Sequence, residues 1–404
     1  MEYQQMKRLL YIADTVPFPF NTGGKLRTAN ILIQLSTYYD VDFVVYSTDS
    51  VTDDQKKEMN NYCKKVFCFA EGIPPTLKRV RNVLSAKCNK EFVVYSKHMQ
   101  KAIDQLLISN KYDLIFIERL YGFQYVEDYL KNTKNSSPTY VDMHDVESDT
   151  IQYFRKMTSS MIKKLYYSIE YMKVKSLEKK VITAVTGMIT VSERDMEIYK
   201  KRYPSNSNKL QYMNNGIDMN KPQNEPVVKR DIATVMFIGS LRHPPNSQAL
   251  EWFVSNIWDC ILSNEPQAKF QIIGSGELED SLMQKIKAKS NIEFLGYVKN
   301  IYPLLRKCTC LVVPLLSGSG TRLKILEAFS FSIPIISTTI GAEGLPIKHE
   351  KNIMLADTKQ DFANETIKLL RDSSLANRIA SNGYHVVEKN YNWENIVSKF
   401  VNHL

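Results

Sequence analysis

The sequence predicts an α/β protein built from two doubly wound domains, each with a parallel sheet. The chain has 404 residues, which is long for one hydrophobic core and typical of two domains. Its apolar segments are nearly continuous and alternate with helical segments, the pattern of parallel sheets that helices cover on both faces. The alternation restarts at Thr234, and both halves carry a glycine-rich turn after a strand. Each half is therefore expected to form its own Rossmann-like domain.

The first half of the chain contains six expected strands separated by helical stretches. Each is short, apolar and rich in β-branched or aromatic residues, which favours buried strands. A helix is expected from about residue 25 to 38, and Ser192 is a suitable N-cap for the helix after the sixth strand. The expected strands are residues 8–13, 41–46, 65–69, 114–118, 139–143 and 187–191.

The second half repeats this pattern. Two of its apolar runs end in the glycine-containing sequences FIGSL and IIGSG. Asn, Pro and charged residues cluster between Tyr212 and Asp231, where hydrophobic periodicity lapses, so the domain boundary is expected there. The predicted division is 1–215 for the first domain, 216–385 for the second and 386–404 for a terminal helix. The expected strands begin near residues 234, 269, 292, 311 and 333, and a helix is expected near 247–262.

The most informative segment for function is residues 310–345. A buried strand ends in a Gly-Ser-Gly-Thr turn, which opens a helical pattern with Arg322, Lys324 and Glu327. Free N–H groups at a helix N-terminus favour anions, and glycines let a ligand approach the main chain. Two cations in the first turn oppose the helix dipole, so helix stability does not explain them. We expect them to bind a diphosphate and Glu327 to accept hydroxyls of an attached ribose. The alternatives are a solvated helix face and a Glu327–Lys324 ion pair.

A second candidate group lies at the ends of strands in the first half. His144 follows a buried strand and is flanked by Asp142 and Asp145, at the edge where open α/β sheets bind ligands. Glu118 and Arg119 lie at the end of the preceding expected strand. Their side chains either contact a ligand or form an internal salt bridge, and the sequence favours neither alternative.

The net charge and the composition indicate which kinds of molecule the protein is expected to bind. The net charge of +10 is typical of proteins with a polyanionic partner: nucleic acid, an anionic membrane face or phosphorylated substrates. No nucleic-acid-binding motif or aromatic stacking platform is recognised. Two stretches, 76–101 and 153–180, are basic and contain aromatic residues. Each is either a solvated surface or a binding surface for anionic lipid headgroups or for a lipid-diphosphate-linked acceptor. No segment approaches a membrane span of about 20 apolar residues, and the six cysteines lack metal or disulfide spacing, so a cytosolic, reduced protein is expected.

Seven short motifs occur in one order along the chain. They are NTGGKLR at 21–27, VDMHD at 141–145, NNGID at 214–218, FIGSL at 237–241, IIGSGEL at 272–278, LEAFS at 326–330 with IGAEG at 340–344, and YNW at 391–393. Together they resemble the motifs of retaining glycosyltransferases of the GT-B fold, specifically family 4 (glycosyl transferases group 1), over essentially the whole chain.

The resemblance implies two Rossmann-like domains that face each other across a cleft and bind a nucleoside-diphosphate sugar, with no metal or other cofactor. The expected acceptor is a glycan or a lipid-linked acceptor of bacterial polysaccharide or glycoconjugate biosynthesis. The enzyme is expected to be cytoplasmic and peripheral at the inner face of the cell membrane. No carboxylate nucleophile is needed, because in the family's front-face mechanism the leaving phosphate takes the acceptor proton. The expected catalytic residues are His144, which contacts sugar hydroxyls, Arg322 and Lys324. The expected donor-binding residues are Gly23, Gly24, Gly239, Ser240, Arg242, Gly274, Gly318, Ser319, Gly320, Thr321, Leu323 and Glu327, and the expected acceptor-binding residues are Lys25, Arg27, Glu118 and Arg119.

The sequence departs from the family pattern at two places. Ser319 stands where the family usually has the first of its two glutamates, and residues 240–246 lack the lysine that usually follows the first strand of the nucleotide domain. We infer that Arg322 and Lys324 supply the missing cations, as in the subgroup with a Gly-x-Gly-Thr-Arg-x-Lys pattern, and that Arg242 shares the task. Two alternatives stay open: a nucleotide-sugar epimerase on the same fold, and a non-catalytic partner subunit that binds nucleotide sugar.

Overall fold

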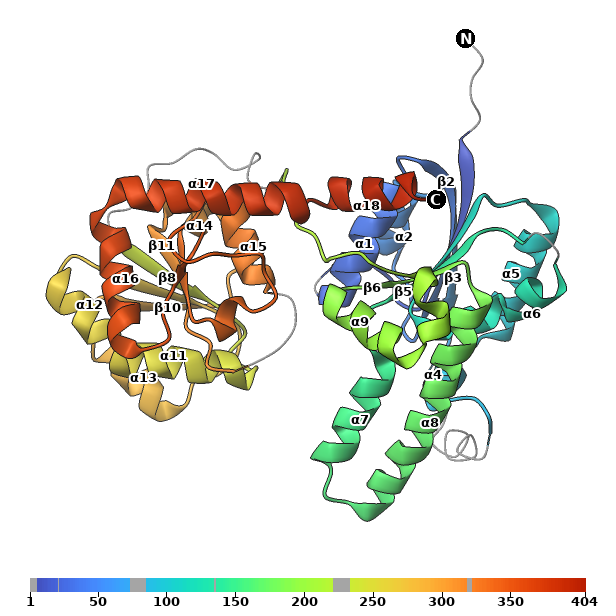
Figure 1. Ribbon diagram of the computed structural model, residues 1–404, viewed down its shortest axis with the longest axis horizontal. Helices are drawn as coiled ribbons and strands as arrows, with labels where there is room; N and C mark the ends of the chain where they lie inside the picture. The colour runs from blue at the N-terminus through green and yellow to red at the C-terminus, as the bar shows by residue number, and fades with distance from the viewer. Residues whose placement is uncertain (1–5, 21, 73–84, 134–135, 221–232, 318–321) are drawn as a thin grey trace, which may run out of the picture. The chain divides into compact units, whose positions relative to one another are not determined.

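The computed structural model describes residues 6–20, 22–72, 85–133, 136–220, 233–317 and 322–404. The first of its two compact units comprises Met1–Asn215 and Ile396–Leu404, and the second comprises Gly216–Asn395 (Figure 1). The division between Asn215 and Gly216 coincides with the predicted one. The terminal segment differs from the predicted 386–404, because residues 386–395 stay with the second unit.

The first unit contains a seven-stranded sheet in the order β3-β2-β1-β4-β5-β6-β7, and every neighbouring pair is parallel. Its central strands are buried on both faces, which is why they appear in the sequence as continuous apolar runs. The strands are β1 (Lys7–Ala13), β2 (Tyr39–Ser47), β3 (Lys65–Ala70), β4 (Leu114–Glu118), β5 (Thr139–Met143), β6 (Gly187–Thr190) and β7 (Leu210–Tyr212).

Helices make the connections that parallel strands require. The first of them, α1 (Gly23–Leu35), begins after the N-cap Thr22, whose hydroxyl accepts a hydrogen bond from the backbone N–H of Lys25 over 3.4 Å. The other helices of this unit are α2 (Asp53–Asn60), α4 (Asn89–Val93), α5 (Lys97–Ser109), α6 (Glu127–Asn132), α7 (Glu147–Met157), α8 (Met161–Ala184) and α9 (Glu193–Arg202), with the 3₁₀ helices η2 (Leu120–Tyr125) and η3 (Pro204–Lys209).

The second unit repeats this architecture with six parallel strands in the order β10-β9-β8-β11-β12-β13. Its core is formed by the apolar side chains of these strands and of the helices packed on them. The strands are β8 (Thr234–Ile238), β9 (Lys269–Ile273), β10 (Ile292–Gly296), β11 (Cys310–Val313), β12 (Ile335–Ser337) and β13 (Met354–Leu355).

Two helices of the second unit pack unusually closely. A Cβ on Gly383 of α17 (Ser373–Asn390) would lie 2.4 Å from the ring of Phe329 in α15 (Leu323–Ser330). Gly383 therefore lets α15 rest directly on α17. The remaining helices are α11 (Pro244–Asn256), α12 (Trp258–Asn264), α13 (Asp280–Lys287), α14 (Tyr302–Lys307), α16 (Lys359–Arg371) and the 3₁₀ helix η4 (Ile340–Ala342).

The C-terminal helix α18 (Trp393–Asn402) ends against the sheet of the first unit. Phe400 lies edge-on to Phe116 of β4, with ring centroids 5.9 Å apart, and to Tyr140 of β5 at 5.2 Å. At the start of this helix, a Cβ on Gly216 would lie 2.6 Å from the Trp393 indole, so the NNGID and YNW motifs are in direct contact.

Several elements differ from the sequence-based expectation, and the single helix expected near 247–262 is two helices, α11 and α12. Strands β7 and β13 were not expected, and they are too short to give a periodic signal. Helices α7 and α8 form a long hairpin where only a basic stretch was expected (Figure 1). Within the described ranges, no helix combines the length and the apolarity that a bilayer span requires.

Candidate active site

Both sheets change direction at an equivalent place. In the first unit β1 and β4 are neighbours whose connections leave toward opposite edges of the sheet, and β8 and β11 have the same relation in the second. Open α/β sheets bind ligands outside the carboxyl ends of the strands at such a point. Several of the polar residues predicted from the sequence lie there, one group in each unit.

In the second unit a pocket of about 200 Å³ lies beside the segments that follow β8 and β11. Three of the predicted residues, Arg322, Leu323 and Lys324, line it at the start of α15. The four predicted residues that precede them, 318–321, lie outside the described residues. The complete lining is His243, Pro245, Asn246, Leu315, Arg322, Leu323 and Lys324.

Among the described residues, the ammonium group of Lys324 contacts neutral groups and lies near one other cation. Its Nζ donates to Asn246 Oδ1 over 2.9 Å and lies 5.4 Å from the centroid of the Phe237 ring. Burial, and then the charge of Arg322, lower the pKa of Lys324 to about 8. Across the described part of the chain, no carboxylate pairs with this ammonium. A desolvated cation without a counter-ion favours binding of an anion.

Arg322 connects two of the sequence motifs. The residue is 7 % exposed, and its Nη2 donates to the carbonyl of Ile340 over 2.8 Å, in the IGAEG loop after β12. This loop packs tightly on the sheet, because a Cβ on Gly341 would lie 2.5 Å from Ser337 Oγ and 2.6 Å from the Val313 carbonyl. The guanidinium is therefore fixed beside the pocket by the main chain.

The glycine turns that follow β8 and β9 pack against each other. The backbone N–H of Leu241 donates to the Ser275 carbonyl over 2.7 Å. A Cβ on Gly274 would lie 1.9 Å from the carbonyl oxygen of Gly239, a separation that no side chain permits. The packing of the two turns is therefore sufficient to require glycine at position 274, without a contact to the donor.

Asn246 belongs to the pocket but was not predicted. Its Nδ2 donates to the Ser240 carbonyl over 2.9 Å, while its Oδ1 accepts from Lys324. The amide is therefore oriented by the glycine turn and holds the lysine in place. Its position in the first turn of α11, directly after the first strand of the domain, is the signal that the sequence offers.

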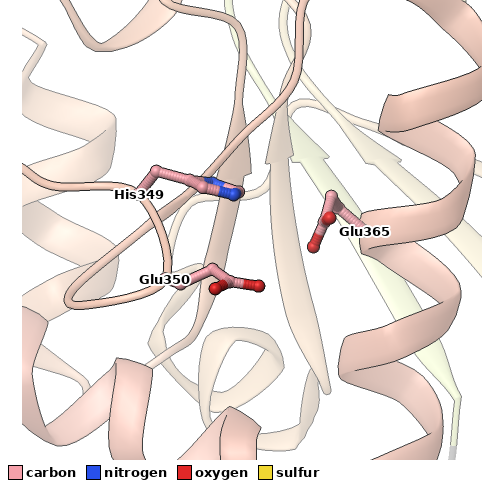
Figure 2. A group of neighbouring side chains, drawn as sticks. All are labelled: His349, Glu350 and Glu365. Carbon is pink, nitrogen blue, oxygen red and sulfur yellow. The ribbon is translucent and has the colours of Figure 1, made fainter.

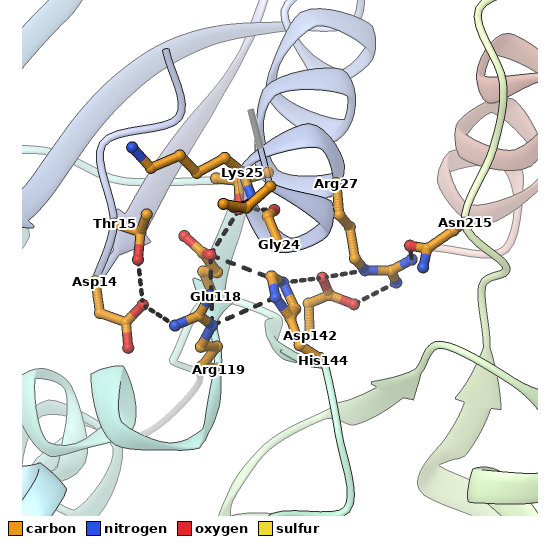
Figure 3. A network of polar contacts seen from close by, with 12 residues as sticks. Asp14, Thr15, Gly24, Lys25, Arg27, Glu118, Arg119, Asp142, His144 and Asn215 are labelled. Carbon is orange, nitrogen blue, oxygen red and sulfur yellow. Dashed lines mark hydrogen bonds and ion pairs between the residues drawn. The ribbon is translucent and has the colours of Figure 1, made fainter. Parts of the chain in front are cut away.

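A network of charged side chains occupies the corresponding edge of the first unit (Figure 3). His144 Nε2 lies 3.4 Å from Asp142 Oδ2 and 3.7 Å from Glu118 Oε1. On the other side of the ring, Arg119 Nε donates to His144 Nδ1 over 3.3 Å. The other ring nitrogen, Nε2, faces the carboxylates. Protein groups thus face both ring nitrogens and fix the orientation of the imidazole.

Arg119 has a backbone conformation that favours glycine, with φ 63° and ψ 162°. Strain of this kind is common at ligand sites. The side chain pairs with Asp14, after β1, at 3.3 Å and lies 3.7 Å from Glu118. A Cβ on Gly24 would lie 2.8 Å from Arg119 Nη2 and 3.4 Å from His144 Nδ1. The start of α1 therefore packs directly against these two side chains. Four of the predicted residues, Gly24, Glu118, Arg119 and His144, thus lie together.

Arg27 differs from the expectation that it contacts the acceptor. The side chain is 1 % exposed and forms a bidentate ion pair with Asp142, at 2.8 Å from Nε and 2.6 Å from Nη2. Its Nη1 donates to the Met213 carbonyl and to Asn215 Oδ1, which joins α1, β5 and the NNGID segment (Figure 3). Burial alone would raise the pKa of Asp142, but the guanidinium holds it well below its usual range. These contacts give Arg27 a structural role and argue against direct contact with an acceptor.

The remaining predicted residues lie nearer the surface. Gly23, Ser240 and Arg242 are exposed, and Arg242 is not part of the pocket lining. Lys25 and Glu327 are half-buried, and Glu327 lies one turn of α15 beyond Leu323.

Glu118 ends β4 as a fully buried carboxyl group, and its Oε1 accepts from Thr28 Oγ1 over 2.6 Å. Burial raises the pKa of Glu118 to about 7, against the opposing charges of His144 and Arg119. The unfolded chain loses this proton near the ordinary value of 4.5, whereas the folded chain keeps it up to about 7. The stabilising contribution is therefore complete below pH 4.5 and is lost as the pH rises through 7, a change of about 3 kcal/mol.

Replacing Glu118 by glutamine should remove this pH dependence, because glutamine still accepts from Thr28 but does not titrate. We expect the free energy of unfolding of the wild type, relative to Glu118→Gln, to fall by about 3 kcal/mol between pH 4.5 and 7.5. Urea denaturation at the two pH values measures it. Glu197→Gln, at a half-exposed carboxylate of α9, is the matched control. Parallel pH profiles for the wild type and Glu118→Gln would contradict the assigned proton affinity.

One group of described residues has the composition of a metal site. His349, Glu350 and Glu365 place one ligand atom each within 4.8 Å of one another (Figure 2). Lys368 forms an ion pair with Glu350, and its Nζ lies 3.8 Å from Glu365 Oε2, so a side-chain cation already contacts both carboxylates. His349 and Glu350 lie shortly before β13, on the side of its amino end, whereas ligands of open α/β sheets bind at the carboxyl ends of the strands. We assign this group no part in the active site.

Comparison with known proteins gives the second unit a family match. Residues 232–372 match the family model described as Glycosyl transferases group 1. An uncharacterized 44.6 kDa protein in the cps region of Klebsiella pneumoniae is 22% identical over 97% of this chain and 98% of its own length. The O-antigen biosynthesis glycosyltransferase WbnH of Escherichia coli is 28% identical over 34% of this chain and 38% of its own length.

Solved structures share the fold. The crystal structure of Anabaena Alr3699/HepE in complex with UDP and glucose matches 98% of this chain and 99% of that chain, with a TM-score of 0.60 and 15% identity. Two Rossmann-like parallel sheets and this structural similarity confirm the predicted fold class, and the group 1 match with the glycosyltransferase-named relatives confirms the predicted transferase activity. The chain is a glycosyltransferase with the GT-B fold.

Proposed function

We propose that this enzyme moves a sugar from a nucleoside-diphosphate sugar to a glycan or lipid-linked acceptor, with retention of the anomeric configuration. The observation that carries the proposal is the cation pair Arg322 and Lys324 beside the pocket of the second unit. A diphosphate would supply the negative charge that Lys324 lacks among the described residues. The structural neighbour HepE, described with UDP and glucose, supports a nucleotide sugar as the donor.

The two cations are suited to stabilise the leaving group. Negative charge accumulates on the diphosphate as the bond to the sugar breaks, and cations that are already in place need no reorganisation at that moment. The guanidinium of Arg322 is able to hold two phosphate oxygens, and Lys324 acts as a point charge. We assign Glu327 to the ribose hydroxyls and the main chain of 318–321 to the phosphates, following the family resemblance. With this charge supplied by side chains, we propose that no metal or other cofactor takes part.

In the first unit, we assign the point where Gly24, Arg119 and His144 meet to the substrate. His144 orients sugar hydroxyls there, and the leaving phosphate takes the acceptor proton, so no carboxylate base is required. The charge of Lys25, in the first turn of α1, suits a phosphate of a lipid-linked acceptor. Glu118 is fully buried and supports Arg119 and His144 rather than touching the acceptor.

The relatives point to the biological setting. WbnH is named for O-antigen biosynthesis, and the Klebsiella protein is encoded in a cps region. They support a role in bacterial polysaccharide or glycoconjugate biosynthesis. We place the enzyme in the cytoplasm, at the inner face of the cell membrane, where a lipid-linked acceptor would be reached.

Thermal-shift measurements with UDP-, GDP- and CDP-sugars test the donor class. One nucleotide series should raise the melting temperature, because a ligand at 100 times its Kd adds about 2.7 kcal/mol to the stability of the folded state. The bound sugar is then offered to glycan and lipid-linked acceptors, and NMR of the product gives the anomeric configuration. Products with inverted configuration would contradict the retaining mechanism. Absence of binding by every nucleotide sugar would contradict the proposed donor.

A further inference from the structure

The α7–α8 hairpin of the first unit concentrates exposed apolar side chains. The two helices extend together away from the sheet (Figure 1). Of seventeen large apolar side chains that are exposed among the described residues, seven lie on this hairpin, and Ile162 is the second most exposed of all at 83%. The seven are Tyr153, Phe154, Met157, Met161, Ile162, Leu165 and Met172.

Most of these side chains surround the turn between the helices, residues 158–160. Met161, Leu165 and Met172 recur at helical spacing along α8, a stripe that normally faces a core. Here the stripe faces solvent. A contiguous apolar surface of this kind marks an interaction site more often than isolated exposed residues do.

The tip of the hairpin, the turn and the helix ends beside it, is strongly basic. Residues 150–169 contain four cations, Arg155, Lys156, Lys163 and Lys164, and no carboxylate. In the ranges that the structure describes, none of the four forms an ion pair. The tip therefore combines apolar side chains with uncompensated positive charge.

The base of the hairpin is firmly attached. Glu178 of α8 is fully buried and accepts from the Ser148 backbone N–H at 3.0 Å, from the Ser148 hydroxyl at 2.9 Å and from the Tyr199 hydroxyl at 3.0 Å. Nearer the tip, the rings of Phe154 and Tyr167 stack with centroids 6.0 Å apart and hold the helices together. The hairpin is thus an ordered projection, and the exposure of its tip does not come from a poorly packed helix.

We propose that this tip, residues 153–165, docks on an anionic lipid bilayer. Met157, Met161, Ile162 and Leu165 would enter the boundary between headgroups and acyl chains, and the neighbouring cations would contact lipid phosphates. Apolar side chains beside basic ones are the combination by which interfacial helices bind membranes. A second copy of the chain fits less well, because pairing two tips would bring like charges together. Docking would bring the enzyme to a lipid-linked acceptor, and only this purpose rests on the proposed function.

Co-sedimentation of the full chain with vesicles, without donor or acceptor, tests this docking. Phosphatidylcholine vesicles that contain phosphatidylglycerol should bind the protein, pure phosphatidylcholine should bind it weakly, and added salt should weaken binding. The double variant Met161→Ser, Ile162→Ser should lower partitioning by at least about tenfold. The variant Lys163→Glu, Lys164→Glu should lower it by about thirtyfold or more.

Two exposed residues on other elements provide matched controls. Ile108→Ser, at an 85% exposed position of α5, and Lys287→Glu, on α13, should bind vesicles as the wild type does. Equal binding to both kinds of vesicle, or unchanged binding by both tip variants, would overturn the proposal. So would a tip-dependent self-association, seen by sedimentation velocity, in place of vesicle binding. The tip variants should keep the wild-type rate of transfer to a water-soluble acceptor, so failure of docking is distinguishable from failure of the proposed function.

Discussion

Lys324→Met should lower the rate of sugar transfer by about 100- to 1000-fold, the loss typical of removing one preorganised group that stabilises developing negative charge. Methionine has nearly the same length and fills the same space beside Phe237 and Asn246. The stability of the protein should not fall, because the variant removes a desolvated cation from the neighbourhood of Arg322. Transfer kinetics and urea denaturation of the same preparation measure both effects.

Lys285→Met, at a half-exposed lysine of α13 in the same unit, is the matched control and should transfer sugar at the wild-type rate. The lowered pKa of about 8 adds a second signature: donor binding by the wild type should weaken as the pH rises above 8, when the ammonium is lost, and the methionine variant should lack this decline. A methionine variant that unfolds more readily but keeps its activity would give Lys324 a structural role.

Asp142→Asn should lower the free energy of unfolding by about 3–5 kcal/mol, because it leaves the buried Arg27 guanidinium without its counter-ion. Asparagine offers one oxygen where the carboxylate offers two, so the bidentate contact is lost as well. The change also removes one of the charges beside His144. Urea denaturation near neutral pH gives the difference.

Glu197→Gln breaks an exposed ion pair with Lys200 and should cost less than about 1 kcal/mol. The double variant Arg27→Met, Asp142→Asn should recover part of the loss, since no uncompensated charge stays buried. Equal stabilities for Asp142→Asn and Glu197→Gln would show that the Arg27–Asp142 pair contributes nothing to the fold.

The strands that could be predicted are those buried on both faces. β1 and β4 appear in the sequence as continuous apolar runs because helices cover both sides of them. β7 and β13 lie at sheet edges and contain three and two residues, too few for any period to be visible. The α7–α8 hairpin was missed because the apolar residues around its turn are interleaved with cations and face solvent.

Local signals predicted where the site residues lie along the chain but not how they pair. Arg27 and Asp142 are 115 residues apart, and only the packing of α1 beside β5 makes them partners. Nothing in the sequence distinguishes the buried Arg27 from the half-buried Lys25 two positions earlier. The same holds for Asn246, which meets Lys324 across 78 residues.

A crystal structure of the enzyme with its nucleotide sugar would test most directly whether Arg322 and Lys324 hold the donor diphosphate. We predict phosphate oxygens within about 3 Å of Lys324 Nζ and of the Arg322 guanidinium, at the start of α15. A donor bound elsewhere at saturating concentration, with Lys324 still donating to Asn246 and no phosphate beside it, would contradict the account.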